Sequence, residues 1–200
     1  IAALRRALVG QPCILNDPLR GYCFVAPLQS PSPSTPPRHN LAIRLSPVVG
    51  RDQVLGALVR RLSGQRLMML TGCAGVGKST LALALAERAV PRYRDGVWWV
   101  DLATVQAPMQ MLRHVANTLQ LEPCANAVEL SRQLSTRQLL LVLDGADWLL
   151  GACRHLVRTL REHAPQVTLL LSSREALQVP GEWVQHVPTL TQPTPSAWRS

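Results

Sequence analysis

The sequence predicts an α/β fold in which a parallel sheet is covered by helices on both faces. From about residue 46 onward, short apolar segments of strand length alternate with longer segments of helical periodicity. This alternation is typical of buried parallel strands joined by helices. In addition, the apolar segment over residues 67–71 runs directly into the sequence GCAGVGKS, a glycine-rich loop of the kind that joins a strand to a helix.

The first 25 residues predict a helix followed by a β-hairpin. The helix is expected over residues 1–8 (IAALRRAL), where apolar residues recur at helical spacing. Two short strands, residues 13–15 and residues 20–25, flank an Asn-Asp-Pro turn. The sequence starts within the expected helix and without Met, so we expect a fragment of a longer protein.

A proline-rich segment separates this part from the α/β part. Residues 29–40 (QSPSPSTPPRHN) hold four prolines among Ser and Thr, a composition that favours an extended, semi-rigid linker over a packed core. We therefore divide the chain into residues 1–28, a linker over residues 29–45, a domain over residues 46–192, and the start of a further segment over residues 193–200.

Within the α/β part, each apolar segment is assigned as a strand and each longer periodic segment as a helix. The strands are expected at residues 67–71, 97–102, 139–143, 167–172 and 183–187, and the helices at residues 79–90, 108–121, 127–135 and 149–163.

The composition excludes several classes of protein. The 200 residues are 47% hydrophobic and 16% charged, which suffices for a core and excludes wholesale disorder. No apolar run reaches the roughly 18 residues that a membrane span needs. The five cysteines are odd in number and lack zinc-site spacing, so we expect reduced thiols in a cytoplasmic protein. The net charge of +9 permits an anionic partner without identifying it.

The strongest functional signal is a phosphate-binding loop. The segment Gly72-Cys73-Ala74-Gly75-Val76-Gly77-Lys78-Ser79 fits the pattern G-x-x-x-x-G-K-[ST] at every fixed position. Its glycines allow backbone N–H groups to point at phosphate oxygens, and the following helix adds partial positive charge. Lys78, the only Lys among 21 basic residues, is expected at the β- and γ-phosphates. The Ser79 hydroxyl is expected on Mg²⁺, with Thr80 as a neighbouring contact. The alternative is a glycine-rich turn that binds no nucleotide.

Two acidic residues follow the apolar strand over residues 139–143. Asp144 stands at its end, where a nucleotide bound to such a loop needs a carboxylate for Mg²⁺. Asp147 has two interpretations. It could polarise an attacking water, or it could be an acid at a helix start that the helix dipole stabilises.

Arg174 follows the strand over residues 167–172, which we expect beside the strand of the glycine loop. An arginine at that strand end could contact the γ-phosphate and report its presence. The alternative is a surface arginine paired with Glu175 or Glu182.

Further segments accompany the glycine loop at consistent spacing. Val49-Gly50-Arg51-Asp52 precedes it, and GVWWVDLA, LLLVLDGADWLL and LLLSSREAL follow. Together these segments resemble the NB-ARC-like branch of the STAND ATPases over about residues 46–192. The resemblance implies that Gly50 and Arg51 lie against adenine, that the cofactors are ATP or ADP with Mg²⁺, and that turnover is slow.

The first 28 residues resemble the end of an OmpR/PhoB-type winged-helix domain. LRRAL matches the end of its recognition helix, and LRGYCFVAP matches a wing that reads GRGYRFVAP in that family, with Leu and Cys replacing a Gly and an Arg. The resemblance implies a P-loop NTPase domain preceded by the remnant of a winged helix, with Arg5, Arg6 and Arg20 as DNA contacts. The alternative is an unrelated helix-and-hairpin unit.

The two resemblances together imply a nucleotide switch in a DNA-binding transcriptional regulator. The nucleotide state would control oligomerisation or DNA occupancy, and the partners would be the nucleotide, DNA and further copies of the chain. Two alternatives stay open, a non-hydrolysing module that holds ADP and a P-loop motor or metabolic ATPase. ATP turnover separates the switch from the first alternative, and DNA binding separates it from the second.

Other polar and aromatic features are interpreted as structural. Trp98 and Trp99 lie in an expected strand, which favours burial in the sheet over base stacking. Asp101 ends that strand, with an assisting role at the site as the alternative. Three arginines at helical spacing favour a solvated basic face over a second nucleic-acid site: Arg154, Arg158 and Arg161.

Overall fold

The computed structural model describes residues 14–17, 21–24, 39–43, 48 and 50–189, within two compact units, Ile1–Pro36 and Pro37–Ser200. In the first unit, strands β1 (Ile14–Asp17) and β2 (Gly21–Phe24) pair antiparallel, as the predicted hairpin requires. The helix predicted over residues 1–8 and the three predicted DNA contacts, Arg5, Arg6 and Arg20, lie outside the described residues.

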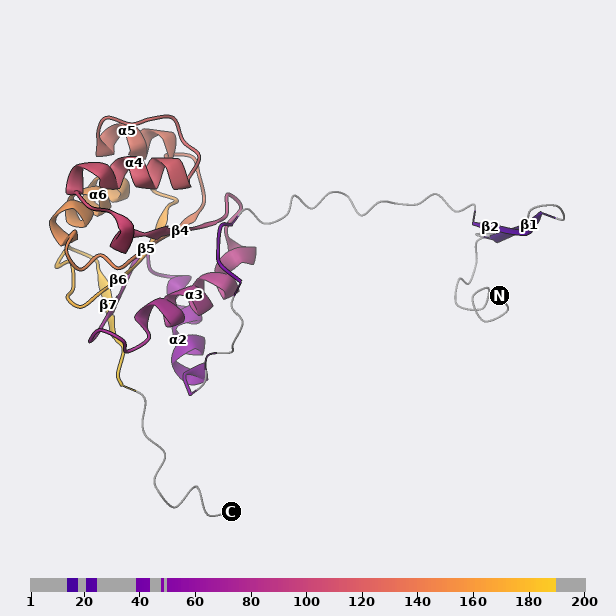
Figure 1. Cartoon of the computed structure of the whole chain (residues 1–200), viewed down its shortest axis with the longest axis horizontal. Coiled ribbons are helices and arrows are strands. Elements are labelled where there is room, and N and C mark those ends of the chain that lie inside the picture. The colour runs from indigo at the N-terminus through magenta and orange to yellow at the C-terminus, as the bar shows by residue number, and fades with distance from the viewer. Residues whose placement is uncertain (1–13, 18–20, 25–38, 44–47, 49, 190–200) are drawn as a thin grey trace, which may run out of the picture. The chain divides into compact units, whose positions relative to one another are not determined.

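The second unit contains a parallel five-stranded sheet in the order β4-β5-β6-β3-β7 (Figure 1). The strands are β3 (Leu67–Thr71), β4 (Val97–Asp101), β5 (Leu140–Asp144), β6 (Thr168–Ser173) and β7 (Trp183–His186). Helices α2 (Asp52–Leu62) and α3 (Lys78–Ala89) cover one face, and α4 (Pro108–Thr118), α5 (Ala127–Gln133) and α6 (Leu150–His163) cover the other. The predicted α/β fold with a parallel sheet is therefore confirmed.

The sheet is apolar on both faces because each face is covered. In β5, Leu141 and Leu143 join the core under α4, α5 and α6, whereas Leu140 and Val142 join the core under α2 and α3. All four side chains are completely buried. Burial of each such side chain contributes about 1.5–3 kcal/mol, so these two cores hold the rigid sheet whose strand ends carry the polar residues.

Several details differ from the sequence-based expectation. Strand β1 includes Asn16 and Asp17, which were expected in the turn. Helix α2 was not predicted, although Leu55, Leu58 and Leu62 are buried on one side of it. Strand β4 ends one residue early, because the Asp101 carboxylate accepts a hydrogen bond from the Ala103 N–H (2.9 Å) and starts the short 3₁₀ helix Leu102–Thr104. Helix α4 ends at Thr118, three residues before the predicted end.

The edge of the sheet at β4 is covered by the last two residues of the proline-rich segment. His39 bridges Val97 in parallel register. The Asn40 side-chain amide both accepts from the Trp99 N–H (2.6 Å) and donates to the Trp99 carbonyl (2.7 Å). Trp98 is buried and Trp99 half-buried, so the prediction that these rings pack in the sheet is confirmed.

No helix in the described part of the chain has both the length and the hydropathy needed to span a membrane. The cysteines whose side chains are described, Cys73, Cys124 and Cys153, are free thiols. Burial raises the pKa of the Cys153 thiol to about 12. Within the described residues, His, Cys, Asp and Glu form no cluster of three or more that could hold a metal.

Candidate functional site

The glycine loop, residues 72–77, connects the carboxyl end of β3 to the first turn of α3. Gly72 has φ of 149°, and a Cβ added there would lie 2.9 Å from the Val187 carbonyl oxygen. Gly77 is the N-cap of α3 with φ of 90°. Both positions favour glycine, because residues with a Cβ atom rarely adopt these backbone conformations. The unpaired N–H groups at the start of α3 therefore lie together at the end of the loop. The helix dipole favours an anion at this position.

Lys78 is the first residue of α3, and its side chain folds back over the loop. Its Nζ donates hydrogen bonds to the carbonyl oxygens of Gly72 and Cys73, both at 2.9 Å. Charged phosphate oxygens are stronger acceptors for an ammonium group than neutral carbonyls. The loop around this ammonium is open to solvent, since Cys73, Ala74, Gly75, Ser79 and Thr80 are exposed.

Asp144 lies at the carboxyl end of β5, and a serine of the neighbouring strand β6 fixes its carboxylate by a hydrogen bond. Ser172 of β6 is buried, donates its hydroxyl hydrogen bond to Asp144 Oδ1, and accepts one from the Gly145 N–H at 3.0 Å. Ser172 was not predicted as a site residue. The available signal was a polar residue at the end of an otherwise apolar strand. Because β6 separates β5 from β3, Asp144 and the glycine loop lie at the same sheet edge with one strand between them.

Asp147 and Arg174 form a pair at this edge. Asp147 Oδ1 accepts from the backbone N–H of Arg174 (2.6 Å) and from its Nε (3.3 Å). Asp147 does not cap α6, because this helix has Leu149 as its N-cap and no side-chain cap hydrogen bond. The alternative partners of Arg174 are also wrong. Glu182 instead accepts from the backbone N–H groups of residues 177–179.

Arg51 holds the loop to the end of β7. It is 8% exposed, and its Nη2 donates to the carbonyl oxygens of Val76 (2.6 Å) and Pro188 (3.0 Å). The Val187 N–H donates a hydrogen bond of 2.7 Å to the carbonyl oxygen of Thr71, the last residue of β3. The chain after β7 is therefore bonded to the end of β3, where the glycine loop begins. Gly50 precedes Arg51 with φ of 72°. The structure thus places the Gly50–Arg51 segment against the glycine loop, and the Pro188 carbonyl joins the site as a group that was not predicted.

We expect Arg51→Lys to lower the unfolding midpoint by roughly 3–8 °C. One ammonium cannot reproduce the planar guanidinium, and loss of a hydrogen bond to a buried acceptor costs about 1–3 kcal/mol, each worth about 2–4 °C in a domain of this size. Thermal unfolding followed by circular dichroism measures the shift. Arg88→Lys is the control, since Arg88 is exposed and lies 3.9 Å from Asp52. Equal midpoints for the two variants would show that Arg51 does not hold the loop.

The structure bears on two further predictions, for Asp101 and for the arginines of α6. The Asp101 carboxylate caps the 3₁₀ helix after β4, and this contact is structural. In the strand register Asp101 lies opposite Asp144. The solvated face expected along α6 is wrong for two of its three arginines. Arg154 Nε donates to the Leu177 carbonyl (2.8 Å), and Arg161 donates to the Pro180 carbonyl, whereas Arg158 is exposed.

The residues at this edge fit a polyphosphate with a divalent cation. The loop offers an ammonium group and a helix start for the phosphates. The Ser79 hydroxyl and the Asp144 carboxylate are the oxygen ligands that Mg²⁺ prefers. Asp147 and Arg174 supply an acid and a cation beside Asp144, at the tip of the strand that neighbours the loop strand.

Comparison with known proteins agrees with this architecture. Residues 59–179 match the protein family described as AAA domain. An uncharacterized protein of Mycobacterium tuberculosis is 35% identical over 157 residues, which are 77% of this chain and 40% of that protein. A second M. tuberculosis protein, whose name proposes an HTH-type transcriptional regulator, is 35% identical over 133 residues, 65% of this chain and 15% of that protein. The chain thus spans less than half of either relative.

Two solved structures share the fold. The crystal structure of Cdc6p from Pyrobaculum aerophilum has a TM-score of 0.54 at 17% identity and covers 74% of this chain and 46% of that one. The STAND protein with a tetratricopeptide repeat sensor from Pyrococcus horikoshii has a TM-score of 0.52 at 13% identity and covers 76% of this chain and 25% of that one. At these identities the two structures support the fold alone.

Proposed function

This chain belongs to the AAA domain family, and from that premise we propose that it is the nucleotide switch of a DNA-binding transcriptional regulator. The observation that carries the proposal is the Asp147–Arg174 pair at the tip of β6. It lies at the same sheet edge as the glycine loop, on the strand next to the loop strand. The Arg174 side chain is exposed and the Asp147 carboxylate is half-buried. Ion pairs near the surface contribute little to stability, so a third charged group can separate these two side chains at low cost.

In the proposed mechanism, Lys78 leaves the Gly72 and Cys73 carbonyls and binds the β- and γ-phosphates of ATP. Ser79 and Asp144 hold Mg²⁺, with Ser172 keeping the Asp144 carboxylate in place. When bound there, Mg²⁺ would supply positive charge that offsets the negative charge of the phosphates. Gly50 and Arg51 lie against the adenine, and residues 73–77 and Thr80 complete the cradle.

Arg174 then distinguishes ATP from ADP. A γ-phosphate offers its guanidinium a more highly charged partner than the single carboxylate of Asp147. Once released, Asp147 can accept a proton from the attacking water while the water oxygen bonds to the γ-phosphorus and the bond from phosphorus to the ADP oxygen breaks, which gives slow hydrolysis. ADP lacks the γ-phosphate, so the Asp147–Arg174 pair re-forms and the chain returns to the arrangement described above.

The change at Arg174 can reach the rest of the domain through contacts already described. Residues 174–182 form a loop that leads into β7. The Glu182 carboxylate holds this loop together by accepting hydrogen bonds from its backbone N–H groups. The end of β7 contacts the glycine loop through Arg51 and Pro188. Two nucleotide states of this loop would bias the domains that flank the chain, and so oligomerisation or DNA occupancy.

We expect the Arg174 amide to exchange its hydrogen faster with a non-hydrolysable ATP analogue than with ADP, because its bond to Asp147 breaks in the ATP state. Hydrogen exchange with mass spectrometry measures this, and light scattering on the same samples reports oligomerisation. In Arg174→Ala the nucleotide still binds but the two states become indistinguishable, whereas the exposed control Arg113→Ala behaves as wild type. Equal exchange with both nucleotides in the wild-type chain would contradict the switch and favour a module that holds either nucleotide passively.

A further inference from the structure

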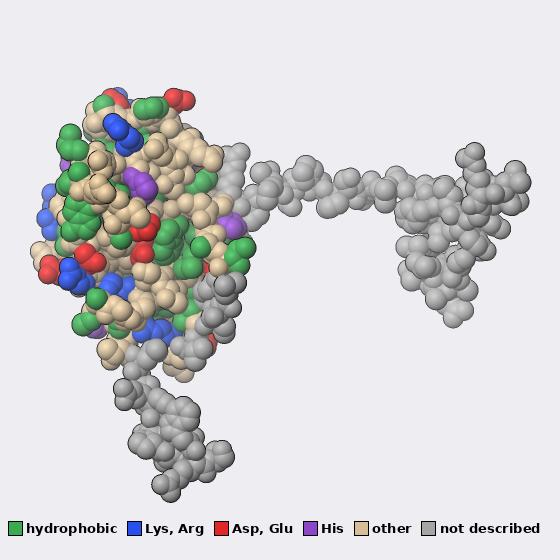
Figure 2. Space-filling view, in the orientation of Figure 1, with side chains coloured by type: hydrophobic (Ala, Val, Ile, Leu, Met, Phe, Trp, Pro, Cys, Tyr) green, Lys and Arg blue, Asp and Glu red, His purple; other side chains and the backbone are tan. Residues whose placement is uncertain are grey.

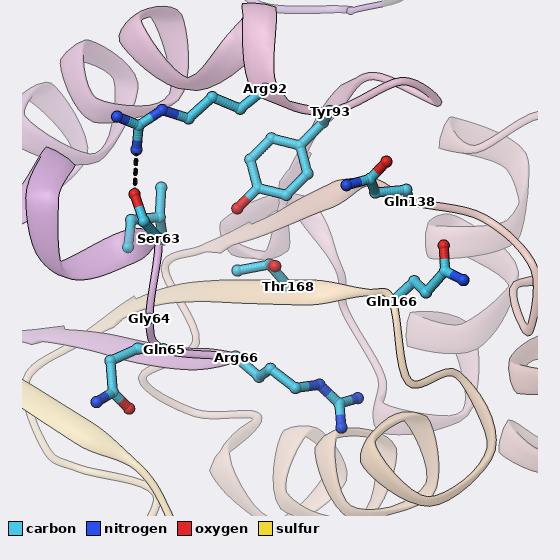
Figure 3. Close-up of a pocket in the computed structure, with 10 residues that line it drawn as sticks. Ser63, Gly64, Gln65, Arg66, Arg92, Tyr93, Gln138, Gln166 and Thr168 are labelled. Atoms are coloured by element: carbon cyan, nitrogen blue, oxygen red, sulfur yellow. Dashed lines mark hydrogen bonds between the residues drawn. The ribbon is translucent and has the colours of Figure 1, made fainter.

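Two grooves lie at the sheet edge opposite the glycine loop, where the strands begin. The first encloses about 360 Å³ between the end of α2 and the starts of β5 and β6 (Figure 3). Its polar lining includes Arg66, Arg92, Gln65, Gln138 and Gln166. The second encloses about 410 Å³ and is lined by Arg66, Arg158, Arg161, Glu162 and Pro180. Arg66 belongs to both grooves, so they adjoin.

We name the four arginines of these grooves, Arg66, Arg92, Arg158 and Arg161, the arginine edge. In the described part of the chain, none of them forms an ion pair with a carboxylate. Among the residues that the structure describes, Glu162 is the only acid that lines either groove. On the face of the domain drawn in Figure 2, acidic and basic side chains lie near one another. The positive charge of the arginine edge is therefore locally unbalanced.

Arg66 and Arg161 are held close together without a compensating anion. Arg66 extends from the first groove toward the end of α6 (Figure 3), where it donates to the carbonyl oxygens of Arg161 (3.4 Å) and Ala164 (3.0 Å). Both arginines have a buried Nε without an acceptor. Burial and the positive charge of Arg161 lower the pKa of Arg66. A nearby anion would stabilise both cations, and more strongly than in water because the groups are partly desolvated.

The first groove also offers neutral hydrogen-bond donors near these arginines. The side-chain amides of Gln65, Gln138 and Gln166 have no hydrogen-bond partner among the described residues. Arg92 stands at the far side, where it donates to the Ser63 hydroxyl and to the Val59 carbonyl (Figure 3). Arginine side chains and side-chain amides are among the groups that contact phosphate and sugar oxygens of nucleic acids.

We propose that the arginine edge is a second anion-binding surface, distinct from the nucleotide site, that takes the phosphate backbone of duplex DNA. Two adjoining basic grooves suit a polymer that presents charges in succession better than a single small anion. The neutral amides that line the same groove as Arg66 and Arg92 add donors for phosphate and sugar oxygens along the strand. The contacts carry no base readout, so binding here is independent of sequence and adds to whatever specific contacts the regulator makes elsewhere.

The test compares two doubly substituted full chains that carry the same net charge. Arg92→Gln/Arg158→Gln removes two exposed members of the arginine edge. Arg113→Gln/Arg132→Gln removes two exposed arginines of α4 and α5 that line neither groove. The five arginines before residue 45 remain in both. Fluorescence anisotropy measures binding of a labelled duplex of about 20 base pairs between about 50 and 200 mM salt.

The slope of log K against log salt concentration should fall by about 2 in the arginine-edge variant, roughly one for each lost phosphate contact, with about 10-fold weaker binding. The control variant should keep the wild-type slope. Equal losses in both variants, or an unchanged slope in the first, would overturn the proposal.

Further arms of the experiment distinguish duplex DNA from an acidic polypeptide and the arginine edge from the nucleotide site. The Arg158 side chain makes no hydrogen bond within the described residues, so Arg158→Glu keeps the fold and should weaken DNA binding further. A glutamate homopolymer of equal charge should compete poorly with the duplex. Competition better than that of unlabelled duplex would identify an acidic polypeptide as the ligand and overturn the DNA assignment. Lys78→Ala should leave the salt slope unchanged, so failure of the nucleotide proposal and failure of this one are distinguishable.

Discussion

Lys78→Ala should abolish measurable binding of ATP and ADP, with affinity at least about 100-fold below wild type. The ammonium is the cation that the structure places on the first two carbonyls of the glycine loop. Charge-assisted hydrogen bonds contribute about 1.5–3 kcal/mol each, so loss of two to phosphate oxygens exceeds that factor. Equilibrium titration with a fluorescent nucleotide measures the effect.

The fold should survive this substitution, because Lys78 is half-buried and its acceptors lie in a loop that is open to solvent. A far-ultraviolet circular dichroism spectrum and an unfolding midpoint close to wild type are the required controls. Arg88→Ala, an exposed cation later in α3, should bind nucleotide normally. Normal ATP binding by Lys78→Ala would show that the glycine loop is a turn with no nucleotide.

Asp144→Asn is expected to remove the dependence of nucleotide binding on Mg²⁺ and to reduce any ATP hydrolysis by about 100-fold. An amide is a weaker and uncharged ligand for Mg²⁺, and metal stabilisation of phosphate charge contributes several kcal/mol. Titrations with Mg²⁺ and with a chelator, together with phosphate release, report the two effects.

Asp101→Asn is a closely matched control. Asp101 ends the neighbouring strand directly opposite Asp144, but its carboxylate caps the 3₁₀ helix after β4. An asparagine can still accept that capping bond, so the fold and the Mg²⁺ dependence should be preserved. If the two variants lost Mg²⁺ dependence equally, the metal role could not be specific to Asp144.

The sheet and the loop were predictable because both depend on local patterns. Runs such as LMMLT and LLLVL are typical of strands that are covered on both faces, and the glycine loop directly follows the first of them. Helix α2 carries a weaker local signal. Its buried leucines have helical spacing, but Gly56 lies within it and no side chain caps its start.

The partners within the site depend on strand order, which local patterns do not encode. Asp147 and Arg174 are 27 residues apart and meet because Asp147 follows β5 and Arg174 follows its neighbour β6. The same adjacency brings Ser172 onto Asp144. Arg51 reaches the Pro188 carbonyl across 137 residues because β7 pairs with β3.

The arginine edge was equally hidden in the sequence. Arg158 and Arg161 were visible as a helical repeat, but their neighbour Arg66 stands just before β3, in a different part of the sequence. The hydrogen bonds from Arg66 to the carbonyl oxygens at the end of α6 bring these cations to one groove.

Nucleotide binding by the glycine loop is tested by equilibrium titration of the wild-type chain with labelled ATP and ADP, with and without Mg²⁺. We predict saturable binding of both nucleotides at one shared site, with mutual competition and with ATP the more dependent on Mg²⁺. No binding of either nucleotide to a chain shown by circular dichroism to be folded would contradict the proposed switch.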